Sequence, residues 1–334
     1  MNKNTVIKRI EYVDTARGVL IILVVFGHTL LFSGGAVTPP YSYIMKAIYS
    51  FHMTAFFLIS GFLFNKEKWC NSSLASFCKN RALRLIVPYF FFETIGATIH
   101  TLFSWESRES ILTIIKNILF QNVYIGADWY LPTLFCGEVL LFLCCKYLPK
   151  NVNIAIAIVG FLAVASAQGH INSQMLCIVT RTVLCASILL IGYYAQSCFL
   201  SVKPCWCVLG AFVVWIVSSQ LNRLPFPHAA ILGNVTLFLL SGFCGTYFVL
   251  AISEKAPVKF LKYLGNNTLP IMGIHQNIEY LIVFFWGTST SAVFILLSFW
   301  IMFLPELFVV PLLNRICPFL IGKKKVDCKI KLDT

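Results

Sequence analysis

The hydrophobic residues of this chain gather into ten long stretches that are separated by short polar segments. Each stretch is close to the length of about 20 apolar residues that a transmembrane helix needs. Phe and Leu are frequent in them, and no stretch alternates with the period of two that marks the strands of a membrane barrel. The pattern therefore predicts an all-α integral membrane protein with about ten transmembrane helices. The expected helices are residues 18–36, 47–64, 84–104, 129–148, 152–170, 176–198, 204–220, 229–252, 266–286 and 291–313.

One connection between the expected helices has an amphipathic pattern of its own. Residues 105–128 carry apolar side chains at helical spacing. These are Ile111, Leu112, Ile114, Ile115, Ile118 and Leu119. The spacing predicts a short helix that lies at the membrane surface.

The composition excludes most other classes of protein. Of 334 residues, 58% are hydrophobic and 12% are charged, whereas about 25% are charged in an average soluble domain. This excludes a soluble enzyme, a disordered chain and a disulfide scaffold. The 13 cysteines lack zinc-ligand spacing, so we expect small buried hydrophobes and no metal site. We find no internal repeat and expect one membrane domain over residues 1–334, without an appended soluble domain.

The basic residues test the helix count. A net charge of +13 would suit a nucleic-acid partner, but its distribution favours a membrane topology. The loops at residues 1–9, 66–84, 146–150, 203, 255–262 and 315–331 hold 20 Lys and Arg, whereas the opposite loops hold 4. Basic loops stay in the cytoplasm. A topology of ten helices with both termini in the cytoplasm explains this asymmetry. We therefore expect the lipid bilayer, and no nucleic acid, as a partner.

The first expected helix carries ionisable residues, which are costly in lipid and usually face a cavity or a partner. His28 lies eleven positions after Arg17, which brings the two residues within about 20° of each other around the helix axis and about 16 Å apart along it. Asp14 lies on the same face. We therefore consider His28, Arg17 and Asp14 candidate catalytic residues. A buried histidine satisfied by a backbone carbonyl is the structural alternative.

Arg81 and Arg84 lie three residues apart at the start of the third expected helix. Two guanidinium groups on one helical face suit a phosphate. Ordinary positive-inside anchoring explains the pair equally well. His52, near the outer end of the second expected helix, is either a site residue or an interfacial histidine.

Later helices add further polar residues. Trp129 fits an aromatic belt, whereas Glu138 lies deep in its span. His275 and Glu279 have an i, i+4 spacing, at which a carboxylate can orient an imidazole. Arg181 and Glu93 are without assigned partners, and pairing with each other is one alternative.

Several of these strings resemble the membrane acyltransferase-3 family. Asp14-x-x-Arg17-Gly18 with His28 is similar to its first-helix signature, and Phe51-His52-Met53 leading to Ser60-Gly61-Phe62 follows in family order. Arg81-x-x-Arg84 ahead of Pro88-Tyr89 resembles its arginine motif. Trp129-Tyr130-Leu131 and Tyr263-Leu264-Gly265 through Thr268-Leu269 to His275 match its later landmarks. The opening Arg9-Ile10-Glu11-Tyr12-Val13-Asp14 is most similar to stand-alone, fucose 4-O-acetylase-like members.

The resemblance implies an O-acyltransferase that moves acetyl from acetyl-CoA to a carbohydrate hydroxyl, as in the modification of surface polysaccharides, with no tightly bound cofactor. It implies a multi-pass protein of a bacterial inner membrane. His28 corresponds to the essential first-helix histidine, Arg17 to the arginine beneath it, and Arg81 and Arg84 to donor contacts. Some relatives carry an extracytoplasmic hydrolase-like domain, so a separate extracytoplasmic transferase is an expected partner if this chain does not complete the transfer.

A thioester is already activated, so the protein must position both substrates and remove the hydroxyl proton. A neutral histidine in a dehydrated pocket suits a general base, and an acyl-histidine intermediate is the alternative. We expect the acceptor to pass His52 and Trp129, with Glu138, His275 and Glu279 in supporting positions. The rival functions are an acyl translocase that supplies a separate transferase, and a secondary transporter, because intramembrane His, Glu and Arg also form proton relays.

Overall fold

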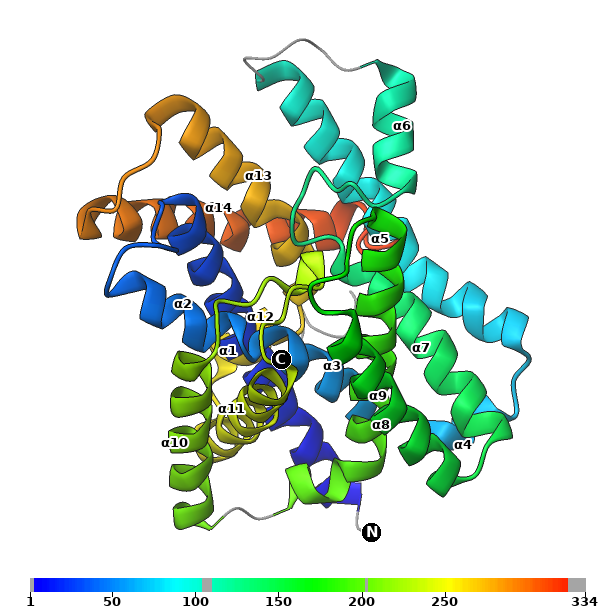
Figure 1. The fold of residues 1–334 in the computed structure, drawn as a ribbon. Coiled ribbons are helices and arrows are strands. Elements are labelled where there is room, and N and C mark those ends of the chain that lie inside the picture. Colours follow the sequence, from blue (N-terminus) through cyan, green and yellow to red (C-terminus); the bar gives the residue numbers. More distant parts are fainter. Residues whose placement is uncertain (1–2, 104–109, 202–203, 324–334) are drawn as a thin grey trace.

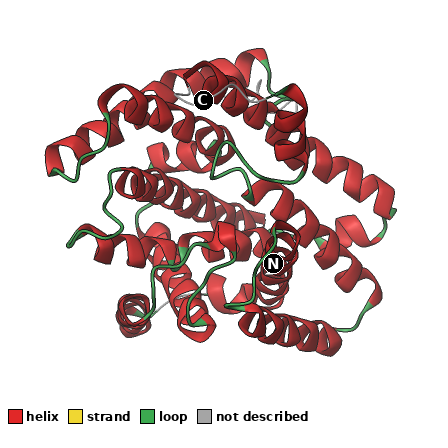
Figure 2. Cartoon of the chain, turned by 45° about the horizontal axis from the view of Figure 1, so that its top comes forward, coloured by secondary structure: helices red, strands yellow, loops and turns green. Residues whose placement is uncertain are grey.

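A computed structural model describes residues 3–103, 110–201 and 204–323, and of these the side chains of residues 3–10 and 70 are left aside. Within these ranges the chain is helical and contains no β-strand (Figure 2). Arg108, Lys203 and the lysines after Lys323, which the charge pattern includes, lie outside the described residues. The side chains of Lys3, Lys8 and Arg9 do so as well.

The helices follow one another along the chain with short connections (Figure 1). They are α1 (Lys3–Phe32), α2 (Tyr41–Tyr49), α3 (His52–Phe62), α4 (Lys66–Cys70), α5 (Leu74–Phe103), α6 (Ile111–Leu119), α7 (Tyr130–Tyr147), α8 (Lys150–Ala167), α9 (Gln174–Leu200), α10 (Cys205–Leu221), a 3₁₀ turn (Pro227–Ala229), α11 (Val235–Lys255), α12 (Lys259–Gly265), α13 (Thr268–Trp286) and α14 (Ala292–Ile316).

The prediction of an all-α membrane protein is confirmed. Among the described residues, 8 helical segments are long and apolar enough to cross a membrane. The remaining two expected spans correspond to α10, which is apolar but has 17 residues, and to α13, in which several polar residues lower the hydropathy. The exact number of spans and the side on which the termini lie stay predictions.

Two boundaries differ from the expected ones. The expected span 47–64 is divided, because α2 ends at Tyr49 and α3 begins at His52. The His52 ring lies within 2.8 Å of the Ile48 carbonyl, so a side chain bonds to an oxygen that a continuous helix would pair with its own backbone. α11 begins at Val235 rather than at residue 229, because Asn234 caps it by accepting a hydrogen bond from the Leu237 N–H.

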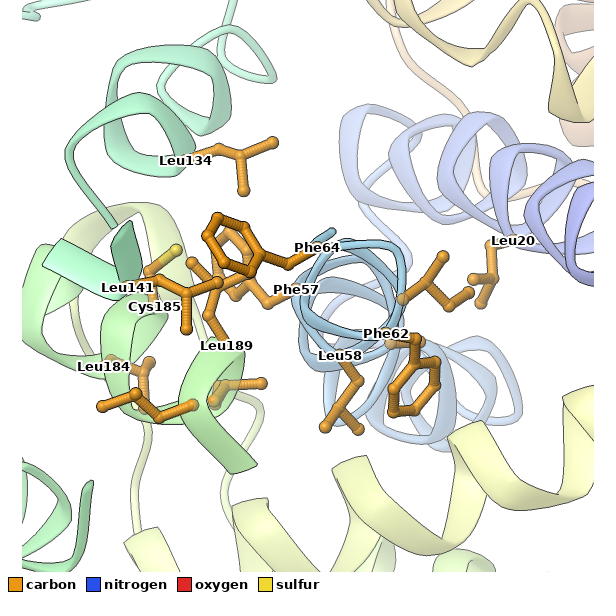
Figure 3. Close-up of a cluster of buried hydrophobic side chains, with 14 of the residues drawn as sticks. Leu20, Phe57, Leu58, Phe62, Phe64, Leu134, Leu141, Leu184, Cys185 and Leu189 are labelled. Carbon is orange, nitrogen blue, oxygen red and sulfur yellow. The ribbon is translucent and has the colours of Figure 1, made fainter. Parts of the chain in front are cut away.

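The helix α3 lies at the centre of the largest hydrophobic core. Its side chains Phe57, Leu58 and Phe62 are at most 2% exposed. Figure 3 shows them between Leu20 of α1 on one side and residues of α7 and α9 on the other. A helix surrounded by protein in this way has little surface left for lipid. This burial brings its first residue, His52, into the interior.

The helices α1 and α12 pack with their backbones in contact. A Cβ atom at Gly18 would overlap the carbonyl oxygen of Leu261, and one at Gly265 would overlap that of Asp14. Both positions therefore require glycine. This explains in physical terms why the Asp14-x-x-Arg17-Gly18 string ends in a residue without a side chain.

The amphipathic helix predicted in the connection after α5 is present as α6, beside α5 (Figure 1). Ile111 and Leu112 are each 77% exposed, whereas Ile118 is buried. The location of this exposed apolar face at the membrane surface stays a prediction. No disulfide joins the cysteines whose side chains are described; Cys145, Cys177 and Cys185 are buried as expected, whereas Cys198 and Cys205 are exposed.

Candidate active site

A cavity of about 450 Å³ opens between α1, α3, α5, α7 and α13. Seven of the ten site residues predicted from the sequence line its wall. They are Arg17, His28, His52, Arg81, Arg84, Trp129 and Glu138. The other three, Asp14, His275 and Glu279, lie behind this wall. The cavity therefore brings together residues from four expected helices. The most distant of them in the sequence, Arg17 and Glu138, are 121 positions apart.

Cationic side chains collect at one end of the cavity. Arg17, Arg81, Arg84 and Lys323 line it, and Glu138 is the one carboxylate among the described lining residues. Such an excess of positive charge at a partly closed mouth attracts a polyanion.

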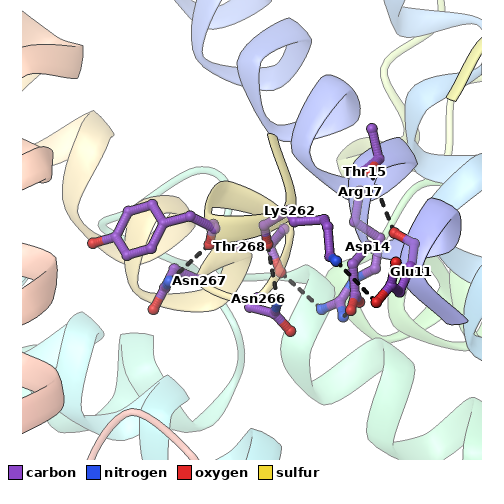
Figure 4. Close-up of polar contacts among 9 residues, drawn as sticks. Glu11, Asp14, Thr15, Arg17, Lys262, Asn266, Asn267 and Thr268 are labelled. Atoms are coloured by element: carbon purple, nitrogen blue, oxygen red, sulfur yellow. Dashed lines mark hydrogen bonds and ion pairs between the residues drawn. The ribbon is translucent and has the colours of Figure 1, made fainter. Parts of the chain in front are cut away.

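Arg17 is held in place by contacts with two elements. Its Nη2 donates to Thr268 Oγ1 at 2.9 Å, and its Nη1 lies 3.7 Å from Asp14 Oδ1. Figure 4 shows both contacts, together with the ion pair of Lys262 and Glu11 that joins α12 to α1. Asp14 therefore orients Arg17, which is the residue of this pair that faces the cavity.

Arg81 and Arg84, the two arginines predicted to bind a phosphate, differ in their surroundings. Arg81 Nε lies 3.0 Å from Glu138 Oε2, and the guanidinium lies over the rings of Trp69 and Phe77, at 5.8 and 5.5 Å from their centroids. Arg84 is exposed at the mouth and has no ion pair within the described part of the chain. Arg81 is therefore a fixed charge of the wall, whereas Arg84 is available to a ligand.

The segment after α14 completes this mouth. Ile321, Gly322 and Lys323 line the cavity, and the backbone at Gly322 approaches the Arg84 carbonyl so closely that a Cβ would lie 2.6 Å from it. Lys323 Nζ donates to Asn267 Oδ1. The sequence marks this tail only as basic, because nothing in its local pattern shows where it folds back.

Imidazole and aromatic rings collect toward the other end of the cavity. The ring centroid of Tyr49 lies 6.0 Å from that of His28 and 5.2 Å from that of His52. Trp129 and His228 line the same region. Burial, and then the nearby Arg181 guanidinium, lower the pKa of His228, so this ring stays neutral at physiological pH.

A glutamine connects His28 to the loop that precedes α7. Gln276 Oε1 accepts a hydrogen bond from the Ala127 N–H at 2.6 Å, and its Nε2 lies 2.7 Å from His28 Nδ1. The sequence offers no signal for Gln276 except its position next to His275. It is the main site residue that the sequence does not reveal.

The loop at residues 121–128 enters the interior of the helical bundle. Glu93 accepts hydrogen bonds from the N–H groups of Tyr124 and Ile125, at 2.8 and 3.2 Å. Irregular backbone at membrane depth requires such partners. Asp128 is fully buried, and burial together with the Glu93 carboxylate raises its pKa well above the usual range.

Arg181 and Glu93 do not pair with each other. Arg181 donates to the His228 carbonyl at 3.0 Å and to Gln121 Oε1, and its guanidinium lies 5.5 Å from the Trp129 ring centroid. It therefore supports the cavity wall from behind.

His275 and Glu279 share a helical face, but no hydrogen bond joins them. His275 Nδ1 bonds to the Ile271 carbonyl at 3.0 Å, and its Nε2 and both Glu279 oxygens are buried without a partner among the described residues. The His275 ring packs against His28 with centroids 5.2 Å apart. Its contact with the cavity is thus through His28.

The fold and the cavity define a multi-pass, all-α membrane protein in which buried imidazoles and a cationic mouth share one chamber. The family model described as Acyltransferase domain matches residues 10–313. The chain therefore belongs to the acyltransferase-3 family of membrane acyltransferases, and the resemblance seen in the sequence is confirmed.

Curated relatives match part of the chain. Nodulation protein NolL of Mesorhizobium japonicum is 27% identical over 161 residues, which is 48% of this chain and 41% of that protein. Nodulation protein NolL of Sinorhizobium fredii is 32% identical over 155 residues, which is 44% of this chain and 40% of that protein. The matches thus span about two-fifths of the length of these relatives. No solved structure matches the chain.

Proposed function

We propose that this protein transfers an acyl group, acetyl in particular, from acyl-CoA to a hydroxyl group of a carbohydrate. The observation that carries this proposal is the cavity, which contains both a cluster of arginines and the first-helix histidine. A thioester donor with a polyanionic head needs both features in one chamber.

The donor enters at the cationic end. Arg84 and Lys323 contact the phosphates of coenzyme A, and Arg81 and Arg17 add fixed positive charge beside them. The thioester then reaches His28, which lies about 16 Å farther along α1, a distance that the pantetheine arm can cover. If the basic loops are cytoplasmic, as the charge pattern predicts, this end faces the cytosolic acyl-CoA of a bacterial inner-membrane protein.

The acceptor occupies the end formed by Tyr49, His52, Trp129 and His228. Flat aromatic faces with polar edges suit the apolar faces and hydroxyl groups of a sugar. An imidazole of this region removes the hydroxyl proton as the oxygen attacks the thioester carbonyl. The first-helix motif assigns this task to His28, and the neutral imidazole is the form required.

The proposal is tested with the purified protein in lipid nanodiscs, radiolabelled acetyl-CoA and a panel of carbohydrate acceptors. We expect a labelled ester on the acceptor together with release of coenzyme A. Release of coenzyme A without a labelled acceptor would indicate an acyl translocase that supplies a separate extracytoplasmic transferase. Uptake of a solute by proteoliposomes without any acyl donor would indicate a transporter instead.

Replacing both Arg81 and Arg84 by alanine is expected to raise KM for acyl-CoA by about 10- to 100-fold, because the lost contact of Arg84 with phosphate is one charge-assisted hydrogen bond, which contributes about 1.5–3 kcal/mol. The expected change in kcat is smaller, since neither residue lies beside His28. Arg223→Ala, an exposed arginine outside the cavity, is the matched control. Unchanged binding of coenzyme A by the double variant would refute the assigned donor site.

A further inference from the structure

The hydrogen bonds of Gln276 determine which nitrogen of His28 carries the proton. A backbone N–H can only donate, so the amide atom that lies 2.6 Å from the Ala127 nitrogen is the oxygen. The other amide atom is therefore the NH₂ group, and it donates to His28 Nδ1 at 2.7 Å. A neutral imidazole that accepts at Nδ1 holds its proton at Nε2. His28 thus presents an N–H donor at its remaining nitrogen.

His52 has the opposite tautomer. Its Nδ1 lies 2.8 Å from the Ile48 carbonyl oxygen, and because a carbonyl can only accept, Nδ1 carries the proton. The lone pair of the neutral ring is then at Nε2. That atom has no hydrogen-bond partner in the described part of the chain, and the residue lines the cavity. His52 is therefore ready to accept a proton.

The two rings line the same cavity and pack on one aromatic side chain. Both flank Tyr49, with ring centroids 6.0 and 5.2 Å from it. His275 has the same tautomer as His52, but its Nε2 is buried and it does not line the cavity. His228 also lines the cavity, but no hydrogen bond within the described ranges fixes its tautomer. Of the two imidazoles whose bonded Nδ1–H leaves the lone pair at Nε2, only His52 lines the cavity.

We infer that His52 is the general base of the transfer reaction and that His28 donates a hydrogen bond through Nε2–H to the thioester carbonyl oxygen, with Gln276 as the residue that positions His28. This inference rests on the proposed function and refines the assignment made from the first-helix motif. One histidine accepts the proton, and the other donates a hydrogen bond to the oxyanion. The fold fixes the hydrogen-bond partner of each ring.

The acceptor oxygen attacks the thioester carbonyl carbon, its proton passes to His52 Nε2, and the carbonyl electron pair moves to the oxygen that His28 Nε2–H contacts. Collapse of this intermediate re-forms the carbonyl and breaks the C–S bond. The thiolate of coenzyme A takes the proton from His52. The products are the acyl ester and coenzyme A, and both rings return to their starting tautomers.

The test compares three variants in the acetyl-transfer assay. His52→Gln is expected to lose about 10²- to 10⁴-fold in kcat, because an amide cannot accept the proton. His28→Gln keeps an N–H donor and is expected to be at least about 10-fold more active than His28→Ala, as a donor contributes about 10²- to 10³-fold. The decrease of kcat at acidic pH, which protonation of the base His52 causes, should persist in His28→Gln, because His52 is unchanged in that variant. Equal activity of the two His28 variants, together with an active His52→Gln, would overturn the inference.

A second measurement does not depend on activity. The chain has 6 histidines, so selective ¹⁵N-histidine labelling resolves the tautomer of each ring by solid-state NMR, with His28 assigned from its loss in His28→Gln. We expect a proton on Nε2 of His28 in the native protein and a mixture of tautomers in Gln276→Leu, whose kcat falls while KM for acyl-CoA is unchanged. A proton on Nδ1 of native His28 would contradict the inference. An absence of acyl transfer would instead refute the proposed function and leave this spectrum unaffected.

Discussion

Replacing His28 by alanine is expected to lower the rate of acyl transfer by about 10²- to 10⁴-fold. The ring is the one imidazole of the cavity that lies on the same helix face as Arg17, and Gln276 fixes its orientation through a 2.7 Å contact. Alanine removes both a proton-carrying nitrogen and the surface against which His275 packs. The proposed position of the donor head is at the arginine end, away from His28, so its binding should change little and the loss is expected in kcat rather than in KM.

The measurement is acetyl transfer by the purified variant, with folding checked by size-exclusion chromatography and thermal unfolding. His170→Ala is the matched control, because His170 is exposed and lies outside the cavity. It should retain native turnover. Retained turnover in His28→Ala would eliminate a reacting centre at this ring, whichever proton transfer it serves.

Replacing Gly265 by valine is expected to destabilise the fold by about 3 kcal/mol or more, which is the upper end of the cost of overpacking. The added Cβ would overlap the Asp14 carbonyl oxygen, and backbone cannot move aside as a flexible side chain does. α12 would have to separate from α1, and the bond from Arg17 to Thr268 would break with it. Stability and donor binding should therefore fall together.

Unfolding of the variant in detergent, followed by heating or by a denaturant series, gives the change in stability. Gly210→Val is the matched control, since no atom lies within 4 Å of the Cβ position at Gly210 in α10. The control should lose no stability, because valine has a higher helix propensity than glycine. Comparable stability of the two variants would show that the α1–α12 contact is looser than its backbone spacing indicates.

The all-α membrane class follows from the sequence because a bilayer imposes one strong requirement, a run of apolar residues long enough to cross it. Each long run is helical, and the run 47–64 is divided between α2 and α3. The cavity residues of α1 could also be predicted, since the 3.6-residue period places Arg17 and His28 on one face regardless of the partner helices.

Contacts between distant segments could not be predicted in this way. Gln276 meets His28 across 248 positions, and periodicity says nothing about which helices are neighbours. The i, i+4 spacing of His275 and Glu279 suggests a pair, but His275 instead bonds one turn back, to the Ile271 carbonyl. The division of α2 from α3 was missed because a short kink leaves the hydropathy of the whole stretch unchanged.

The segment after α14 folds back to the mouth of the cavity and is therefore part of the site. A chain cut back to the end of the last helix, Ile316, would keep every apolar run and would look intact in a hydropathy plot. It would nevertheless lack the wall formed by Ile321 and the positive charge of Lys323. The wall of the cavity thus extends beyond the last apolar helix, and a minimal version designed from hydropathy alone would leave the cationic mouth open on one side.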